Sequence, residues 1–138
     1  MHPDAQRLVS ESGELTAVLG RSVGSDRFAA LALVFATGTL HCRCNDDTDE
    51  IIVEVVEKDS LDYPTVEDDS LGGLVGMAAE YAWEMTNHRG YADAFQLRLR
   101  NAKGHEETRQ FEVGASAMDV RRVIDPHRGA RAPGRSEL

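Results

Sequence analysis

Aromatic residues, prolines and cysteines are scarce in this sequence, and no long apolar run is present. Aromatic residues make up 6% of the 138 residues, with one tryptophan, and there are four prolines and two cysteines. The longest apolar run covers residues 28–36, which is too short for a membrane-spanning helix of about 20 residues. The first residues lack the basic start and apolar middle of a secretory signal. We therefore expect a cytoplasmic protein that does not enter a membrane.

The two cysteines, Cys42 and Cys44, belong to the sequence HCRC. On an extended chain their side chains point to the same face about 7 Å apart, so a disulfide between them would distort the backbone. His41 points to the opposite face, so the three side chains cannot converge on a metal ion without further ligands. We expect two reduced thiols that are buried as small apolar side chains, with no metal and no cofactor.

Negative charge is concentrated in one segment. The chain carries 24 acidic and 15 basic residues, a formal net charge of −9. Residues 46–69 hold eleven acidic residues and one lysine, which gives −10, while residues 1–45 and 70–124 are neutral and the remainder gives +1. A field of this sign repels nucleic-acid phosphates and attracts basic surfaces. We therefore expect a basic protein partner and no nucleic acid.

The first half of the chain predicts a four-stranded antiparallel meander. A short helix over residues 3–11 would precede it, with Ala5, Leu8 and Val9 on one face. The strands, joined by short turns, are expected over residues 14–23, 28–36, 40–44 and 51–57. Because residues 28–36 are apolar on both faces, they are expected at the centre of the sheet.

The second half adds a β-hairpin with its turn at Asn87–Gly90. Its strands cover residues 81–85 and 93–100, and in the second strand Phe95, Leu97 and Leu99 share one face. One interpretation has Trp83 and Phe95 packing across the two strands. The remaining segments fit a short helix or a glycine-rich start of a strand at 71–79, a strand at 108–113, and a last edge strand or short helix at 115–124.

The complete pattern predicts the α+β class. We expect a single domain, residues 1–124, dominated by an antiparallel β-sheet of six to eight strands with one or two short helices. Residues 125–138 contain two prolines and two glycines and are expected to form a disordered tail.

Catalytic motifs are missing or incomplete. The sequence has no phosphate-binding loop and no nucleophile elbow, and its paired carboxylates lie mostly in a segment expected to be solvated. The acidic run at residues 46–50 lacks the spacing of a calcium loop, so a solvated turn is the simpler interpretation. An enzyme is therefore the less favoured class.

The hairpin and the acidic turn each carry an ordered set of residue types. In WEMTNHRGYADAFQL these are Trp83, Glu84, Asn87, Gly90, Tyr91, Asp93 and Gln96, and in NDDTDEI they are Asp47, Thr48, Asp49 and Glu50. The two strings resemble the signature of a family of small bacterial proteins known only as a domain of unknown function. The likeness covers roughly residues 28–99. It implies no activity, because the family has none to transfer, and a comparison with immunity proteins that neutralise toxins is an analogy.

Candidate partner-binding residues come from the acidic turn and the hairpin. They are Asp46, Asp47, Asp49, Glu50, Trp83, Glu84, Asn87, Arg89, Tyr91 and Asp93. The leading hypothesis is an immunity-like binding protein whose acidic face, residues 46–69, engages a basic partner such as a cationic toxin domain. It fails if the acidic face is neutralised internally by Arg98, Arg100, Arg121 and Arg122.

Two alternatives stay open. A small-molecule or metal-dependent enzyme would use a pocket around the hairpin, residues 81–96, into which the side chains of Trp83, Glu84, Asn87, Tyr91 and Asp93 converge. A structural homodimer would pair exposed sheet edges, and the acidic turn would then only keep it soluble.

Overall fold

Eight β-strands and two α-helices form the part of the chain that the computed structural model describes, residues 1–45, 47–67 and 69–124. The elements are α1 (Pro3–Ser10), β1 (Leu15–Gly24), β2 (Arg27–Phe35), β3 (Gly38–Asn45), β4 (Glu50–Val56), the 3₁₀ turn η1 (Lys58–Ser60), α2 (Asp69–Gly72), β5 (Ala78–Thr86), β6 (Ala92–Arg100), β7 (Glu106–Gly114) and β8 (Ala117–Val123). The expected antiparallel α+β architecture is confirmed. The predicted disordered tail lies outside the described residues.

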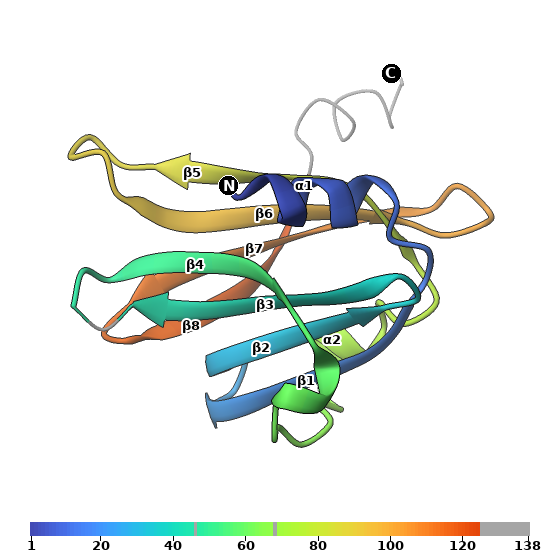
Figure 1. Ribbon diagram of the computed structural model, residues 1–138, viewed down its shortest axis with the longest axis horizontal. Coiled ribbons are helices and arrows are strands. Elements are labelled where there is room, and N and C mark those ends of the chain that lie inside the picture. Colours follow the sequence, from blue (N-terminus) through green and yellow to red (C-terminus); the bar gives the residue numbers. More distant parts are fainter. Residues whose placement is uncertain (46, 68, 125–138) are drawn as a thin grey trace, which may run out of the picture.

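The strands form two antiparallel meanders, β1–β4 and β5–β8, that face each other as two layers (Figure 1). The layers are continuous because one end of β2 pairs with β8, through Arg27 with Asp119 and Phe28 with Met118. The strand order is β4-β3-β2-β8-β7-β6-β5, and β1 lies on the other edge of β2. The result is one strongly curled sheet with its core inside the curl.

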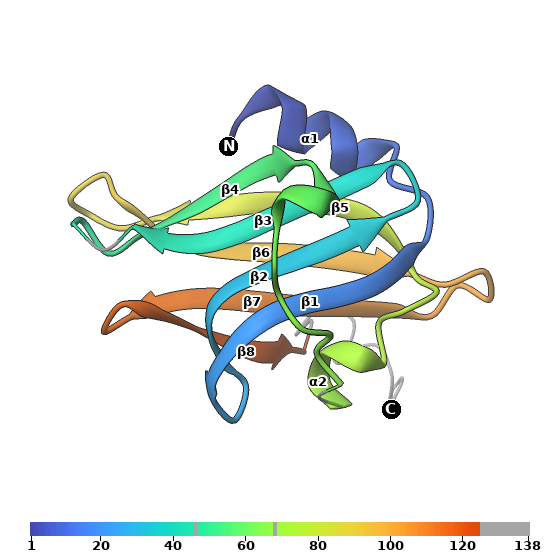
Figure 2. The same ribbon diagram turned by 60° about the horizontal axis from the view of Figure 1, so that its bottom comes forward.

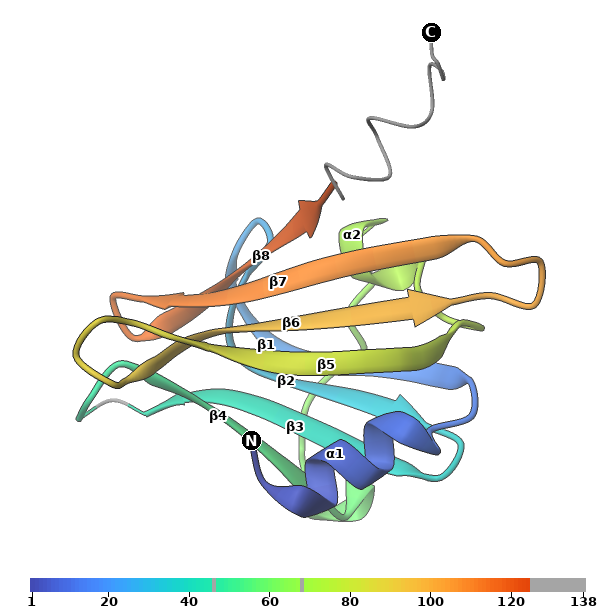
Figure 3. The same cartoon turned by 90° about the horizontal axis from the view of Figure 1, so that it is seen from above.

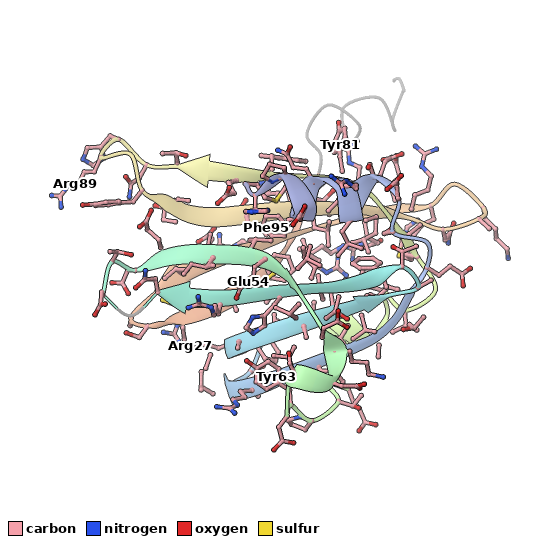
Figure 4. The ribbon with its side chains drawn as sticks, in the orientation of Figure 1. Arg27, Glu54, Tyr63, Tyr81, Arg89 and Phe95 are labelled. Carbon is pink, nitrogen blue, oxygen red and sulfur yellow. The ribbon has the colours of Figure 1, made fainter. Side chains whose placement is uncertain are left out.

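Apolar side chains from both layers fill the space between them. Phe28, Phe95 and Phe111 are almost completely buried, and the ring centroids of Phe95 and Phe111 on neighbouring strands are 5.7 Å apart. Phe95 points into the space between the layers in Figure 4. The predicted inward face of β6 is confirmed, since Leu97 and Leu99 are also buried.

Helix α1 lies in the gap between β4 and β5, the two ends of the strand order (Figure 3). It begins with Pro3 in its first turn, where the missing N–H costs nothing, and the His2 ring accepts a hydrogen bond from the Asp4 amide. The predicted apolar face is confirmed, because Ala5, Leu8 and Val9 are all buried. Neither helix of the described chain has the length and apolar character needed to cross a bilayer.

Residues 57–67, here called the crossing segment, run over the outer face of β1–β3 (Figure 2). The Gly20 amide donates to the carbonyl of Pro64 at 2.9 Å, and the Val66 amide donates to the carbonyl of Val18 at 2.8 Å. Beneath this segment Ala32 of β2 is fully buried although it points away from the main core. The expectation that β2 lies centrally with both faces covered is thus confirmed.

Two details of the second half differ from expectation. Strand β8 is not an edge strand, because it pairs with β7 and with β2. The suggested packing of Trp83 on Phe95 is wrong: the register places Trp83 opposite Gln96 and Glu84 opposite Phe95. Trp83 and Phe95 therefore point to opposite faces of the sheet, which the sequence could not settle without the register of the hairpin.

Replacing Gly20 by alanine is expected to destabilise the fold. A Cβ atom there would lie 2.8 Å from Leu31 Cδ2 and 2.9 Å from the Ala30 carbonyl oxygen, with the crossing segment also close. We expect Gly20→Ala to lower the free energy of unfolding by about 1–3 kcal/mol, measured by urea denaturation. Gly114→Ala is the matched control, because its Cβ would meet nothing within 4 Å. Equal stability of the two variants would contradict the close packing at Gly20.

Candidate functional site

The acidic turn between β3 and β4 is organised by Asn45. Its side-chain oxygen accepts the Asp47 amide at 3.0 Å, and its carbonyl accepts the Asp49 amide at 2.8 Å. Asp49 has a positive φ of 55°, which aspartate tolerates better than most residues. The side chains of Asp47 and Asp49 are exposed, while Glu50 is half-buried at the start of β4. Asp46, the fourth candidate of this turn, lies outside the described residues.

The turn between β5 and β6 is organised by Asn87 in the same way. The Asn87 side-chain oxygen accepts hydrogen bonds from the Arg89 amide at 2.9 Å and the Tyr91 amide at 3.2 Å. Gly90 supplies the positive φ of 86° that the turn requires. Asn87 therefore serves its own turn, and the side chains that the turn presents to solvent include Arg89 and Tyr91.

The two turns are neighbours at one end of the molecule (Figure 1). A contact joins them: the Ala92 amide donates to Glu50 Oε2 at 3.4 Å. We call the surface they form the turn patch, which consists of Asp47, Asp49, Glu50, Arg89 and Tyr91. It brings together five of the predicted partner-binding residues from segments about 40 positions apart.

The other hairpin candidates lie apart from the turn patch. Trp83 is exposed on the outer face of β5, and Glu84 points to the opposite face, where it pairs with the amino group of Met1. Asp93 is half-buried at the start of β6. Three surface hollows of the described residues have volumes of about 340, 520 and 600 Å³, and none of the three is lined by a hairpin candidate. Trp83 and Glu84 in particular do not converge on one point.

Most carboxylates of the acidic segment form no ion pair within the described part of the chain. Of the eight acidic residues in this segment whose side chains the structure describes, seven form no such pair: Asp47, Asp49, Glu50, Glu57, Asp59, Asp62 and Glu67. Three of the four arginines that were expected as competitors pair with acidic residues outside this segment. Arg100 binds Glu80 and Glu106, Arg121 binds Glu112, and Arg122 binds Glu107. The negative charge near the turn patch is therefore available to solvent.

Glu54 is the exception, and it belongs to a cluster on the outer face of β3 and β4. Its Oε2 atom lies 3.1 Å from His41 Nδ1 and 3.0 Å from Arg43 Nε. The other ring nitrogen of His41 lies 2.9 Å from the hydroxyl of Tyr63 on the crossing segment, and the Arg21 guanidinium lies 5.1 Å from the Tyr63 ring centroid. Figure 4 shows Glu54 and Tyr63 on this layer.

This chain of carboxylate, imidazole and phenol fixes the crossing segment to the sheet. The contacts are satisfied when His41 donates from Nδ1 to Glu54 and accepts the Tyr63 O–H at Nε2. His41 is only 6% exposed, and its two nitrogens and the hydroxyl are already engaged. The same groups occur in acid–base relays of enzymes, but here their hydrogen-bonding atoms are engaged with one another.

Part of this cluster had a signal in the sequence. His41 and Glu54 are equidistant from the tight turn at Asn45–Glu50, so the meander with its short turn pairs them directly. Tyr63 had none, because it lies in an irregular segment whose path over the sheet is set by tertiary packing.

The cysteines follow the expected division of faces. Cys42 points into the core, and burial, with a smaller contribution from the charge of Glu54, raises the pKa of its thiol to about 12. Cys44 is half-buried, and neither cysteine is in a disulfide. His41 lies on the opposite face, as expected. No group of three or more metal-ligating side chains is arranged for a metal ion among the described residues.

The fold and the two joined turns thus define a curled antiparallel sheet protein with an exposed acidic end. The model of a family described as "Family of unknown function (DUF6334)" matches residues 1–127, and the chain belongs to this family. The predicted resemblance to a family of unknown function is confirmed, and the match also includes the N-terminal helix. No curated protein and no solved structure matches the chain.

Replacing Glu54 by glutamine is expected to change how stability depends on pH. Partial burial acts to raise the pKa of Glu54, but hydrogen bonds and charges from Arg43 and His41 outweigh it and hold the pKa below its ordinary value. A carboxylate with a lowered pKa in the folded state adds stability above its unfolded pKa, and this stability is lost as the pH falls through the folded value.

The difference in unfolding free energy between the wild type and Glu54→Gln should therefore be largest near neutral pH. It should shrink as the pH falls below about 4. Urea denaturation across this range measures it, with Glu57→Gln as the control at an exposed glutamate without an ion pair in the described chain. A difference that stays constant with pH would refute the role given to the Glu54 carboxylate.

Proposed function

We propose that this chain is a binding protein that docks a basic protein partner on the turn patch. The observation that carries the proposal is the meeting of two turns: Glu50 of the turn with the exposed Asp47 and Asp49 contacts Ala92, the neighbour of the exposed Tyr91. In its most concrete form the partner is a cationic toxin domain that the chain neutralises.

The charge distribution supports this function through association kinetics. The exposed acids of the crossing segment, Glu57, Asp59, Asp62 and Glu67, lie on the same layer as the acidic turn and extend its field. Such a field raises the encounter rate with a positively charged partner, and salt screens it over about 10 Å at 0.1 M.

The composition of the patch supports a short-range contact as well. Tyr91 is 45% exposed and offers a large, rigid, amphipathic side chain of the type that dominates binding hot spots. Arg89 is the one cation of the patch and gives it a means to recognise a carboxylate that flanks the basic residues of the partner. The patch thus combines attraction with specificity.

Charge reversal tests the proposal. The immobilised chain is used to capture proteins from a lysate of the organism that encodes it, and the affinity of a retained basic protein is then measured. The triple variant Asp47→Lys, Asp49→Lys, Glu50→Lys is expected to weaken this affinity at least 30-fold, as the loss of about 2 kcal/mol or more at a charged hot spot would do.

The matched control is the triple variant Asp59→Lys, Asp62→Lys, Glu67→Lys. Both triple variants shift the net charge from −9 to −3, but the control leaves the turn patch intact. The control should lose only a few-fold in affinity, and mainly at low salt. The proposal fails if no basic protein is retained at low salt, or if the two variants weaken binding equally.

A further inference from the structure

A row of large side chains lies exposed along the outer face of β5. Tyr81, Trp83 and Met85 alternate along the strand and are 51%, 37% and 37% exposed. The rings of Tyr81 and Trp83 meet edge to face with centroids 5.5 Å apart, and the Arg98 guanidinium lies 5.3 Å from the Tyr81 ring centroid. Tyr81 points away from the core in Figure 4, and Figure 3 looks onto this layer with no described element over β5 and β6.

The rest of this outer face is polar and electrically balanced. Gln96 donates a hydrogen bond to Gln110 beside the exposed row. The charged side chains that the strand register places on this face are Arg98, Arg100, Arg121, Glu106, Glu112 and Asp119, three of each sign. Aromatic residues, methionine and arginine are enriched at protein interfaces, whereas lysine and glutamate are more frequent on the rest of the protein surface. The exposed row of Tyr81, Trp83 and Met85, with Arg98 beside it, has the composition of an interface.

The position of the face matters because the whole chain carries −9. The exposed acids of the crossing segment lie over β1–β3, on the other layer (Figure 2). A second copy that approaches the outer face of β5–β8 therefore meets a neutral surface and keeps its own acidic segment on the far side. On this approach the two acidic segments stay on opposite sides of the pair.

We propose that a second copy of this chain docks on the outer face of β5–β8, related to the first by a two-fold axis that crosses β5 at Trp83. In an isologous contact of this kind each strand faces its own copy in the opposite direction. Trp83 then meets Trp83 of the second copy, and Tyr81 meets Met85 of the second copy, a sulfur–aromatic contact.

The same symmetry gives complementary contacts on the next strands. Gln96 faces Gln96 of the second copy, and amide side chains can donate to and accept from each other. Arg98 comes over Ala94 of the second copy, whose neighbour across the β6–β7 pair is Glu112. The contact therefore places a cation next to a carboxylate on both sides of the axis. Arg121, in register with Gln110, faces Arg121 of the second copy at the β8 margin, where each is paired with Glu112 of its own chain.

The available area sets the strength of the dimer. Three of the four strands have nine residues, so the face is about 30 Å long and about 19 Å wide. Two copies would bury roughly 1,100 Å² in total, which is at the lower limit for specific complexes. A reversible dimer that forms with rising concentration fits this area.

Sedimentation equilibrium of the full chain tests the dimer at low and high salt. Wild type is expected to shift toward twice its monomer mass with concentration, and more readily at high salt, because salt screens the repulsion between two chains of −9. Trp83→Arg should raise the dissociation constant by about 30-fold or more. Tyr91→Arg, an exposed aromatic residue on the turn patch, is the control and should leave it unchanged.

A pair of substitutions tests the two-fold register. Tyr81→Glu and Met85→Lys should each weaken the dimer, whereas the double variant should recover it, because each introduced glutamate then faces an introduced lysine of the other copy. Circular dichroism and thermal unfolding confirm that the variants fold. A wild type that stays monomeric at all concentrations, a dimer that Trp83→Arg leaves intact, or a double variant no better than the single ones overturns the proposal.

This inference does not rest on the proposed function, and the two fail separately. Capture of a basic partner should weaken with salt and depend on Asp47, Asp49 and Glu50. Self-association should strengthen with salt and depend on Trp83. Trp83→Arg should therefore leave partner capture intact, and the charge reversal of the turn patch should not weaken the dimer, because it reduces the net charge from −9 to −3.

Discussion

Strand β2 is the constraint on which the rest of the structure depends. It pairs with β1, β3 and β8, and its side chains are apolar on both faces. Exposing either apolar face of such a strand to water is unfavourable, so other parts of the chain must pack against both faces. The β5–β8 layer covers the inner face: Phe28 and Leu31 belong to the same buried core cluster as Phe95 and Phe111 of that layer. The outer face is left to the crossing segment, which has no regular structure beyond one 3₁₀ turn.

That cover has an electrostatic consequence. The crossing segment is drawn from the most acidic part of the chain, and carboxylates are expensive to bury unless they are paired. Tyr63 supplies the inward anchor through His41, while the exposed acids around it point to solvent. Glu54, which lies beneath, is held by Arg43 and His41. Covering β2 with this segment therefore places a field of negative charge on one side of the molecule as a by-product of the fold.

Much of the fold followed from the sequence because its signals are local. Alternating apolar residues located the strands, and the apolar run of β2 placed it at the centre. Position within the sheet was less accessible: β8 pairs with β2 through Arg27 and Phe28, a contact between residues about 90 positions apart that no local pattern encodes. The register of the hairpin could not be predicted from the sequence either. A shift of one residue in the pairing of β5 with β6 decides whether Trp83 and Phe95 share a face of the sheet.

For the candidate site, too, local properties could be predicted from the sequence, whereas contacts set by tertiary packing could not. That the acidic turn and the hairpin turn are both exposed follows from their composition, whereas their contact through Glu50 and Ala92 depends on how the two layers stack. The hydrogen bonds of the Asn87 side chain within its own turn could be predicted, because asparagine side chains commonly accept hydrogen bonds from nearby backbone amides in turns. The separation of Trp83 from Glu84 required the register.

The helix α1 decides which kinds of contact with other molecules are open to the sheet. Because α1 lies between β4 and β5, it occupies the gap that two otherwise free strand edges would share, and strand addition there would have to displace its buried Leu8 and Val9. Edge pairing is thus obstructed, while the outer face of β5 stays accessible. In a face-to-face dimer with antiparallel strands, the two turn patches lie at opposite ends. Such an assembly would present two separate acidic sites facing away from each other, so that each could hold its own basic partner without competition from the other.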